Sequence, residues 1–229
     1  MKIKGLQKTT LLDFPEKVAC TVFTGGCNFR CPFCHNASLV LAPTEVNDIS
    51  EEELFRFLEK RRGILDGVCV TGGEPLLQHD ILPFFERIHS LGLSVKLDTN
   101  GWFYDKLSNI ISLGLVDYIA MDIKNTREKY AMTAGIPSVS EDVFKSIKLI
   151  MGCGVPYEFR TTVVRELHTV DDIRDIARSI SGASQYYLQC FKDSGDLIGQ
   201  NYSAHTEDTM RSMLEAIRPF VGKCALRGI

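Results

Sequence analysis

Six short apolar segments, several of them rich in β-branched residues, alternate with helical segments along this 229-residue chain. The predicted strands are residues 18–26, 67–73, 94–101, 116–124, 157–164 and 185–191. Strands that alternate with helices make right-handed crossovers and form a mostly parallel sheet. A full eight-unit barrel commonly needs about 250 residues. The sequence therefore predicts an α/β fold, a partial (βα)6 barrel that forms a single domain over residues 1–229.

Capping residues mark where several predicted helices begin and end. Ser50 with Glu53 makes a capping-box pattern, and Asp80 and Ser140 stand directly before two further apolar-periodic segments. Gly92 occupies the position expected of a glycine just past a helix end. Residues 1–15 are expected to add a small hairpin before the first core strand.

Composition excludes several classes of function. The net charge is −3, and no basic stripe suggests nucleic-acid binding. The N-terminus lacks the apolar core of a signal peptide, and no apolar run is long enough to span a membrane. We therefore expect a cytoplasmic protein with no nucleic-acid or membrane partner.

Chemistry-bearing residues follow the first four predicted strands. The segments are GGCNFRCPFCHN (25–36), TGGEP (71–75), DTNG (98–101) and MDIK (121–124). In parallel α/β folds the carboxyl ends of the strands share one edge, where active sites gather. The four segments are therefore expected to form one site.

The cluster of Cys27, Cys31 and Cys34 allows three interpretations. Structural zinc needs four closed ligands, and His35 directly follows Cys34, which suits a tetrahedral site poorly. A redox disulfide between Cys31 and Cys34 leaves Cys27 without a role. An iron–sulfur cluster held by three thiolates leaves one iron open, as in a catalytic metal site.

The CxxxCxxC spacing, followed by GGEP after the next strand, resembles the radical S-adenosylmethionine (SAM) superfamily. The resemblance implies a barrel of the radical SAM type and a [4Fe–4S] cluster on Cys27, Cys31 and Cys34. The open iron would take the amino and carboxylate groups of SAM. It also implies cofactor contacts from four residues: Phe33, Gly72, Gly73 and Glu74.

A closer resemblance is to the glycyl-radical-enzyme activating proteins, on CNFRCPFCHN, DTNG and MDIK. The opening DFPEKVACTVFTGGCNFRCPFCHN is most similar to anaerobic ribonucleoside-triphosphate reductase activating proteins. This resemblance implies that Asp98, Thr99 and Asp122 lie near SAM and could hold a monovalent cation. It further implies that Lys124 pairs with the SAM carboxylate and that Arg160 and Val163 meet its ribose or adenine.

The chain departs from its relatives at two places. Pyruvate formate-lyase activators carry TVDGPGxR before the first strand, where this chain has TLLDFPEKVA. Many activators carry additional ferredoxin-like cysteine clusters, whereas this chain has one clustered set. We therefore expect a single cluster.

The implied reaction is reductive cleavage of SAM to methionine and a 5′-deoxyadenosyl radical, which takes an α-hydrogen from a glycine of a partner enzyme. No catalytic residue beyond cluster and SAM is needed. The partners would be a glycyl radical enzyme and a low-potential electron donor such as flavodoxin or ferredoxin. The alternatives are action on a small molecule, action on another glycyl radical enzyme such as pyruvate formate-lyase, and a non-enzymatic electron carrier.

The remaining cysteines have simpler interpretations. Cys20, Cys69, Cys153 and Cys190 lie in or beside apolar runs and are expected to pack in the interior. His35 either hydrogen-bonds near the cluster or packs against its neighbours.

Overall fold

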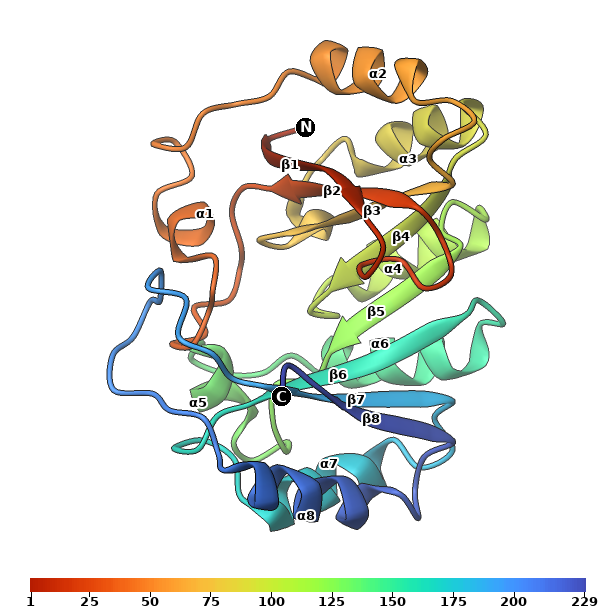
Figure 1. The fold of residues 1–229 in the computed structure, drawn as a ribbon. Helices are drawn as coiled ribbons and strands as arrows, with labels where there is room; N and C mark the ends of the chain where they lie inside the picture. Colours follow the sequence, from red (N-terminus) through yellow and green to blue (C-terminus); the bar gives the residue numbers. More distant parts are fainter.

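A computed structural model describes all residues, 1–229, as one eight-stranded sheet with strand order β1 to β8 (Figure 1). The strands are β1 (Ile3–Thr10), β2 (Ala19–Thr24), β3 (Gly67–Gly72), β4 (Ser94–Thr99), β5 (Tyr118–Asp122), β6 (Tyr157–Val163), β7 (Gln185–Cys190) and β8 (Lys223–Arg227). β1 is antiparallel to β2, and every later neighbour is parallel. Because β1 and β8 lie at opposite edges, the sheet is an open, partial barrel, as predicted.

Helices connect successive parallel strands (Figure 1). They are α1 (Ala37–Leu41), α2 (Glu51–Lys60), the 3₁₀ turn η1 (Pro75–Leu77), α3 (Ile81–Ser90), α4 (Tyr104–Ser112), α5 (Tyr130–Ala134), α6 (Glu141–Gly152), α7 (Val170–Ser179) and α8 (Glu207–Ile217). The longer ones cover the outer face of the curved sheet, whereas α1 and α5 lie beyond the carboxyl ends of the strands (Figure 1). None of the helices is long and apolar enough to cross a membrane.

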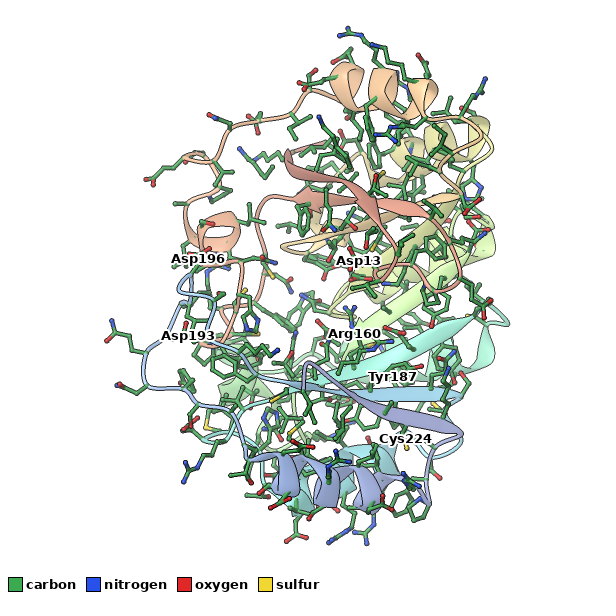
Figure 2. The ribbon with its side chains drawn as sticks, in the orientation of Figure 1. Asp13, Arg160, Tyr187, Asp193, Asp196 and Cys224 are labelled. Atoms are coloured by element: carbon green, nitrogen blue, oxygen red, sulfur yellow. The ribbon has the colours of Figure 1, made fainter.

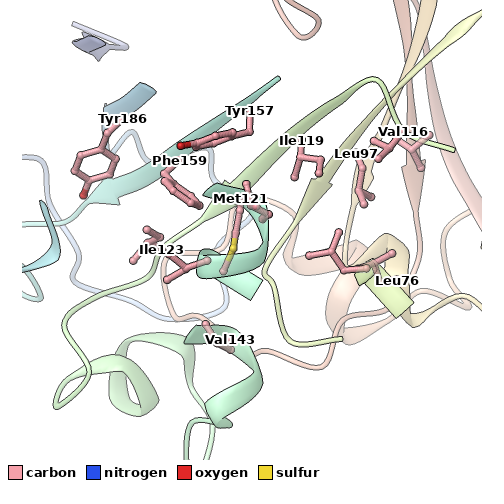
Figure 3. Packing of buried hydrophobic residues seen from close by; sticks show 14 of the residues in the cluster. Leu76, Leu97, Val116, Ile119, Met121, Ile123, Val143, Tyr157, Phe159 and Tyr186 are labelled. Atoms are coloured by element: carbon pink, nitrogen blue, oxygen red, sulfur yellow. The ribbon is translucent and has the colours of Figure 1, made fainter. Parts of the chain in front are cut away.

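The core lies between the sheet and the outer helices. Met121 and Phe159 are fully buried on neighbouring strands and lie near Val143 of α6 (Figure 3). Side chains alternate in direction along a strand, so the next residues face the concave side. On β4 this alternation buries Leu97 in the core and directs Lys96 and Asp98 into the concavity.

The six predicted strands correspond to β2–β7, but the two edge strands were not predicted as such. Residues 1–15 contribute one strand, β1, which pairs with β2 rather than forming a hairpin of its own. β8 reads KCALR, and its charged ends hide a strand from a search for apolar runs. Arg227 on β8 donates to both carboxylate oxygens of the buried Glu158 on β6, at 2.7 and 2.8 Å.

The structure confirms the predicted helix caps at Ser50 and Ser140 but not the one at Asp80. The Ser50 hydroxyl accepts from Glu53 N–H at 3.1 Å, and Ser140 accepts from Asp142 N–H at 3.2 Å. Asp80 occupies the N-cap position but makes no side-chain cap, because its carboxylate pairs with the amino terminus of Met1. Gly92 adopts a φ of +77° after α3, as the predicted C-terminal position requires.

Candidate functional site

The carboxyl ends of β2 to β6 surround a cavity of about 170 Å³. All four chemistry-bearing segments reach it, as the strand order predicts. Every predicted site residue except Val163 lines it: Cys27, Cys31, Phe33, Cys34, Gly72, Gly73, Glu74, Asp98, Thr99, Asp122, Lys124 and Arg160.

The cysteine loop runs from the end of β2 to α1 and is held by backbone hydrogen bonds. Arg30 N–H donates to Ala134 O at 2.9 Å, and Gly26 N–H donates to Leu39 O at 2.8 Å. All three cysteines are free thiols facing the same cavity. Burial raises the pKa of Cys27 to about 12 and that of Cys31 to about 11. A metal centre binds thiolates, so its binding here would displace these protons.

The GGEP segment packs directly against the start of the cysteine loop. A Cβ on Gly73 would lie 1.9 Å from Gly26 O, and one on Gly72 would lie 2.3 Å from Thr24 N. Gly73 N–H donates to Thr24 O, and Glu74 N–H donates to Gly26 O, each at 2.9 Å. The glycines are required because two backbones approach each other closely here, whereas the sequence analysis assigned them to the approach of a ligand.

Glu74 joins the GGEP segment to the end of β4. Its side chain is 1% exposed and accepts hydrogen bonds from Leu76 N–H, Thr99 Oγ1–H and Asn100 N–H, at 3.1, 2.8 and 2.8 Å. Burial raises the pKa of this carboxyl to about 7, against the opposing effect of the hydrogen bonds. The Glu74 side chain therefore fixes the relative position of two strand ends.

Arg160 is the centre of a buried ion-pair network on the concave face (Figure 2). Its guanidinium donates to Asp122 Oδ1 at 2.9 Å and to Asp98 Oδ2 at 3.1 Å. Lys124 Nζ lies 3.1 Å from Asp122 Oδ2, and Lys96 pairs with Asp98. Three cations thus face two carboxylates, and the network carries one positive charge in excess.

The opposite charges in the network stabilise one another, so these side chains stay ionised although they are buried. Burial alone would raise the pKa of Asp122, but Arg160 and Lys124 outweigh it and hold that pKa below its usual range. Burial likewise opposes the charge of Lys124, yet Asp122 raises the pKa of its ammonium. Asp122 and Lys124 are therefore both charged at neutral pH, and the ammonium of Lys124 lines the cavity.

The predicted cation ligands do not converge in this arrangement. The Thr99 hydroxyl donates to Glu74, and Arg160 bridges the carboxylates of Asp98 and Asp122. No three His, Cys, Asp or Glu side chains are grouped so as to hold a single metal ion. The monovalent cation beside Asp98, Thr99 and Asp122 stays a prediction.

Val163 is a correction to the predicted site. Its side chain is fully buried in the core, because β6 directs Val163 outward, and its neighbour Thr162 lines the cavity instead. The alternation along the strand could have indicated this, since Arg160 and Thr162 share one face.

Three contributors were missed by the sequence analysis. Asn100 lies in the quoted DTNG segment and contacts the cysteine loop, and Asn36 donates to Gly72 O at 3.2 Å. Lys96, two residues before Asp98, is 2% exposed and pairs with it. Because side chains alternate along a strand, Lys96 and Asp98 lie on the same face of β4. Only the fold shows that this face of β4 is buried.

The other cysteines and His35 have structural surroundings. Cys20 and Cys69 are fully buried, and Cys153 and Cys190 pack against the core from partly buried positions, as predicted. The His35 ring lies 5.5 Å from that of Phe191, and its Nε2 is 2.5 Å from Lys192 O. His35 therefore connects the cysteine loop to the segment after β7.

The sequence profile described as "Radical SAM superfamily" matches residues 21–180, a range that includes all four cavity-forming segments. The chain belongs to the radical SAM superfamily. The match confirms the predicted superfamily, and with it the expectation of a radical SAM enzyme. It also supports the predicted cofactors, SAM and a [4Fe–4S] cluster.

Individual relatives extend this similarity over the whole chain. A Methanocaldococcus jannaschii protein named "Putative glycyl-radical enzyme activating enzyme" is 29% identical over 234 residues, covering 99% of this chain and 96% of its own. The pyruvate formate-lyase-activating enzyme of Clostridium pasteurianum is 27% identical, covering 78% of this chain and 76% of its own.

A solved structure shows the same fold at low sequence identity. Streptococcus suis SuiB bound to S-adenosylmethionine superposes with a TM-score of 0.70 at 13% identity. The match covers 89% of this chain and 48% of SuiB. It confirms the predicted fold class of a mostly parallel, open α/β sheet.

The residues of this radical SAM chain fit both cofactors. Three free thiols face one cavity without forming a single-ion site, and a polynuclear cluster takes thiolates spread over a larger centre. The ammonium of Lys124 and the guanidinium of Arg160 line the same cavity as the thiols and suit the carboxylate of an amino-acid-like cofactor.

Proposed function

We propose that this protein is an activating enzyme that reductively cleaves SAM and generates a glycyl radical on a partner enzyme. The observation that carries the proposal is the juxtaposition, in one cavity, of three free thiols and the two cationic side chains of Lys124 and Arg160. The names of both relatives, and the nearly full-length coverage of the Methanocaldococcus jannaschii protein, support the glycyl-radical class.

Each wall of the cavity has a proposed role. Cys27, Cys31 and Cys34 hold the cluster, while Lys124 attracts the SAM carboxylate. Gly72, Gly73, Glu74 and Phe33 line the remainder of the amino-acid site, and Arg160 lies toward the nucleoside. When bound, the cluster supplies the electron that cleaves SAM, and the protein positions the cofactors and excludes water.

A second, larger cavity supports the proposal that the substrate is a macromolecule. It measures about 900 Å³ and lies along the concave face, between the loop 11–17 and strands β4 to β8. Asp98 and Arg160 line both cavities, so the ion pair between them forms a wall that the larger cavity shares with the proposed cofactor site. At its rim Leu11 and Leu12 are 71% and 91% exposed, which suits contact with another protein.

The proposed partner is an anaerobic ribonucleoside-triphosphate reductase. The supporting feature is the N-terminal segment TLLDFPEKVA, which forms the loop between β1 and β2 at the rim of the larger cavity. A low-potential donor such as flavodoxin or ferredoxin would supply the electron, and a monovalent cation beside Asp98 and Asp122 remains part of the proposal.

The test is anaerobic reconstitution followed by electron paramagnetic resonance. The protein is mixed with the reductase, SAM and a reductant, and a glycyl-radical doublet is expected. A reductase whose target glycine is replaced by alanine is the matched control and should give no doublet.

Three other outcomes would redirect the assignment. A doublet on pyruvate formate-lyase alone would move the partner to that enzyme. SAM cleavage without a doublet on either enzyme would favour a small-molecule substrate. A cluster that does not cleave SAM would favour an electron carrier.

A further inference from the structure

The side-chain amide of Asn100 has an orientation that its neighbours determine. Its Oδ1 accepts from Trp102 N–H at 3.0 Å, and its backbone N–H donates to Glu74 at 2.8 Å. Because the oxygen is committed to Trp102, the Nδ2 group must face the cysteine loop. There it donates to Asn28 Oδ1 at 2.9 Å and lies 3.9 Å from Cys27 Sγ.

The amide of Asn28 is determined in turn by Asn100. Asn28 Oδ1 accepts from Asn100, so its Nδ2 points elsewhere, and this nitrogen is buried with no partner in the chain. An unpaired buried donor is unfavourable and indicates a missing acceptor. Asn28 directly follows Cys27, and its Oδ1 lies 4.0 Å from Cys27 Sγ. A cluster bound at the neighbouring Cys27 would bring sulfide sulfurs, which can accept from this nitrogen.

We propose that Asn100 donates an amide hydrogen bond to the sulfur of Cys27, that Asn28 donates one to a sulfide of the bound cluster, and that both thereby raise the cluster's reduction potential. The inference rests on the proposed ligation of a cluster by Cys27. Phe29 N–H, 3.3 Å from Cys27 Sγ, is a further donor to the sulfur of Cys27.

The direction of the effect follows from charge. Reduction adds an electron to the cluster and its thiolates, and N–H dipoles directed at the sulfur stabilise the added negative charge. Removing a donor should therefore make reduction harder. Asn100 and Asn28 are positioning residues in this role, because neither acts on SAM or the substrate.

The experiment is a redox titration of the reconstituted full-length protein without SAM, followed by electron paramagnetic resonance of the reduced cluster. At the wild-type midpoint potential, Asn100→Ala should lower the ratio of reduced to oxidised cluster about tenfold, which is ~59 mV for one electron. Asn28→Ala should shift the ratio in the same direction.

Asn125→Ala is the matched control. Asn125 is 2% exposed and donates to Thr133 Oγ1 and Leu167 O, away from the cysteines. This variant loses buried hydrogen bonds but should keep the wild-type potential. An equal shift in Asn125→Ala would show general loosening and overturn the inference.

Iron content separates the remaining outcomes. Unchanged potentials in Asn100→Ala and Asn28→Ala at full iron content would overturn the inference and leave the proposed function intact. If Asn100→Ala fails to retain iron, the midpoint potential of Asn28→Ala, a change at a partly buried residue, decides whether the inference holds. Wild-type protein that binds no iron would overturn the proposed function, and this inference with it.

Discussion

At the scale of single residues, two groups of cysteines differ in what surrounds them. Cys27, Cys31 and Cys34 face a polar cavity, whereas Cys153 Sγ lies 3.3 Å from Ile150 O at the end of α6. Polar, accessible surroundings suit metal ligation, and a helix-end contact suits packing.

The expected consequence is a large difference between two alanine variants. Cys34→Ala should lose the bound cluster and abolish SAM cleavage, because a three-thiolate site does not tolerate the loss of one ligand. Cys153→Ala should retain most of both. Iron analysis and the yield of 5′-deoxyadenosine measure the effect, and equal losses in the two variants would contradict the ligand assignment.

His168 connects the site to the pH dependence of stability. Its ring is 1% exposed; Nδ1 accepts from Val164 N–H at 3.1 Å, and Nε2–H donates to Lys124 O at 2.8 Å. Burial lowers the pKa of His168 below its usual 6.5, although the carbonyl oxygens of Lys124 and Val164, which can accept from the protonated ring, oppose this. The neutral ring thus supports the backbone of Lys124.

The sign of the pH effect follows from that shift. The unfolded chain binds the His168 proton more tightly, so this contribution to stability is present above pH 6.5 and is lost as pH falls toward the lowered folded pKa. Denaturant unfolding at pH 7.5 and pH 5 should show a smaller loss for His168→Gln than for wild type. An identical loss would assign the acid sensitivity to other groups.

At the scale of elements, the loops after β2 and β3 approach each other so closely that a methyl group cannot enter. Gly73→Ala should lower the free energy of unfolding by about 2 kcal/mol, because its Cβ would meet the backbone oxygen of Gly26 at 1.9 Å. It should also reduce iron retention, since the same contact holds the cysteine loop.

Gly152→Ala is the matched control for that variant. Gly152 is in the last turn of α6, and nothing lies within 4 Å of an added Cβ. Alanine favours the helix, so this change should be neutral or stabilising. Thermal unfolding of the two variants measures the difference, and similar midpoints would show that the loops can separate without cost.

At the scale of the whole molecule, an open sheet makes its two edges less protected than its centre. β8 pairs only with β7 and is partly exposed along its length, whereas β5 is buried between β4 and β6. Hydrogen exchange should therefore replace amide protons of Lys223–Arg227 well before those of Tyr118–Asp122. Equal protection of both strands would indicate that the barrel closes.

The predictable part of the fold is the part with strong local signals. The apolar runs of β2 to β7 and the caps at Ser50 and Ser140 are visible in the sequence. β8 was missed because its ends are charged, and its pairing with β7 and Arg227's contact with Glu158 arise only in the folded chain. Asp80 was misread because the amino terminus competes for its carboxylate.

By itself, the sequence determined the superfamily, the strand–helix alternation and the cysteine, glycine and acidic segments, because spacing and residue type are local properties. Tertiary structure alone decided that Arg160 bridges Asp98 and Asp122 and that Asn100 contacts Cys27. These relations join residues on different strands. Their physical cause is the parallel register, which brings distant strand ends together and leaves buried charges and amides to find partners there.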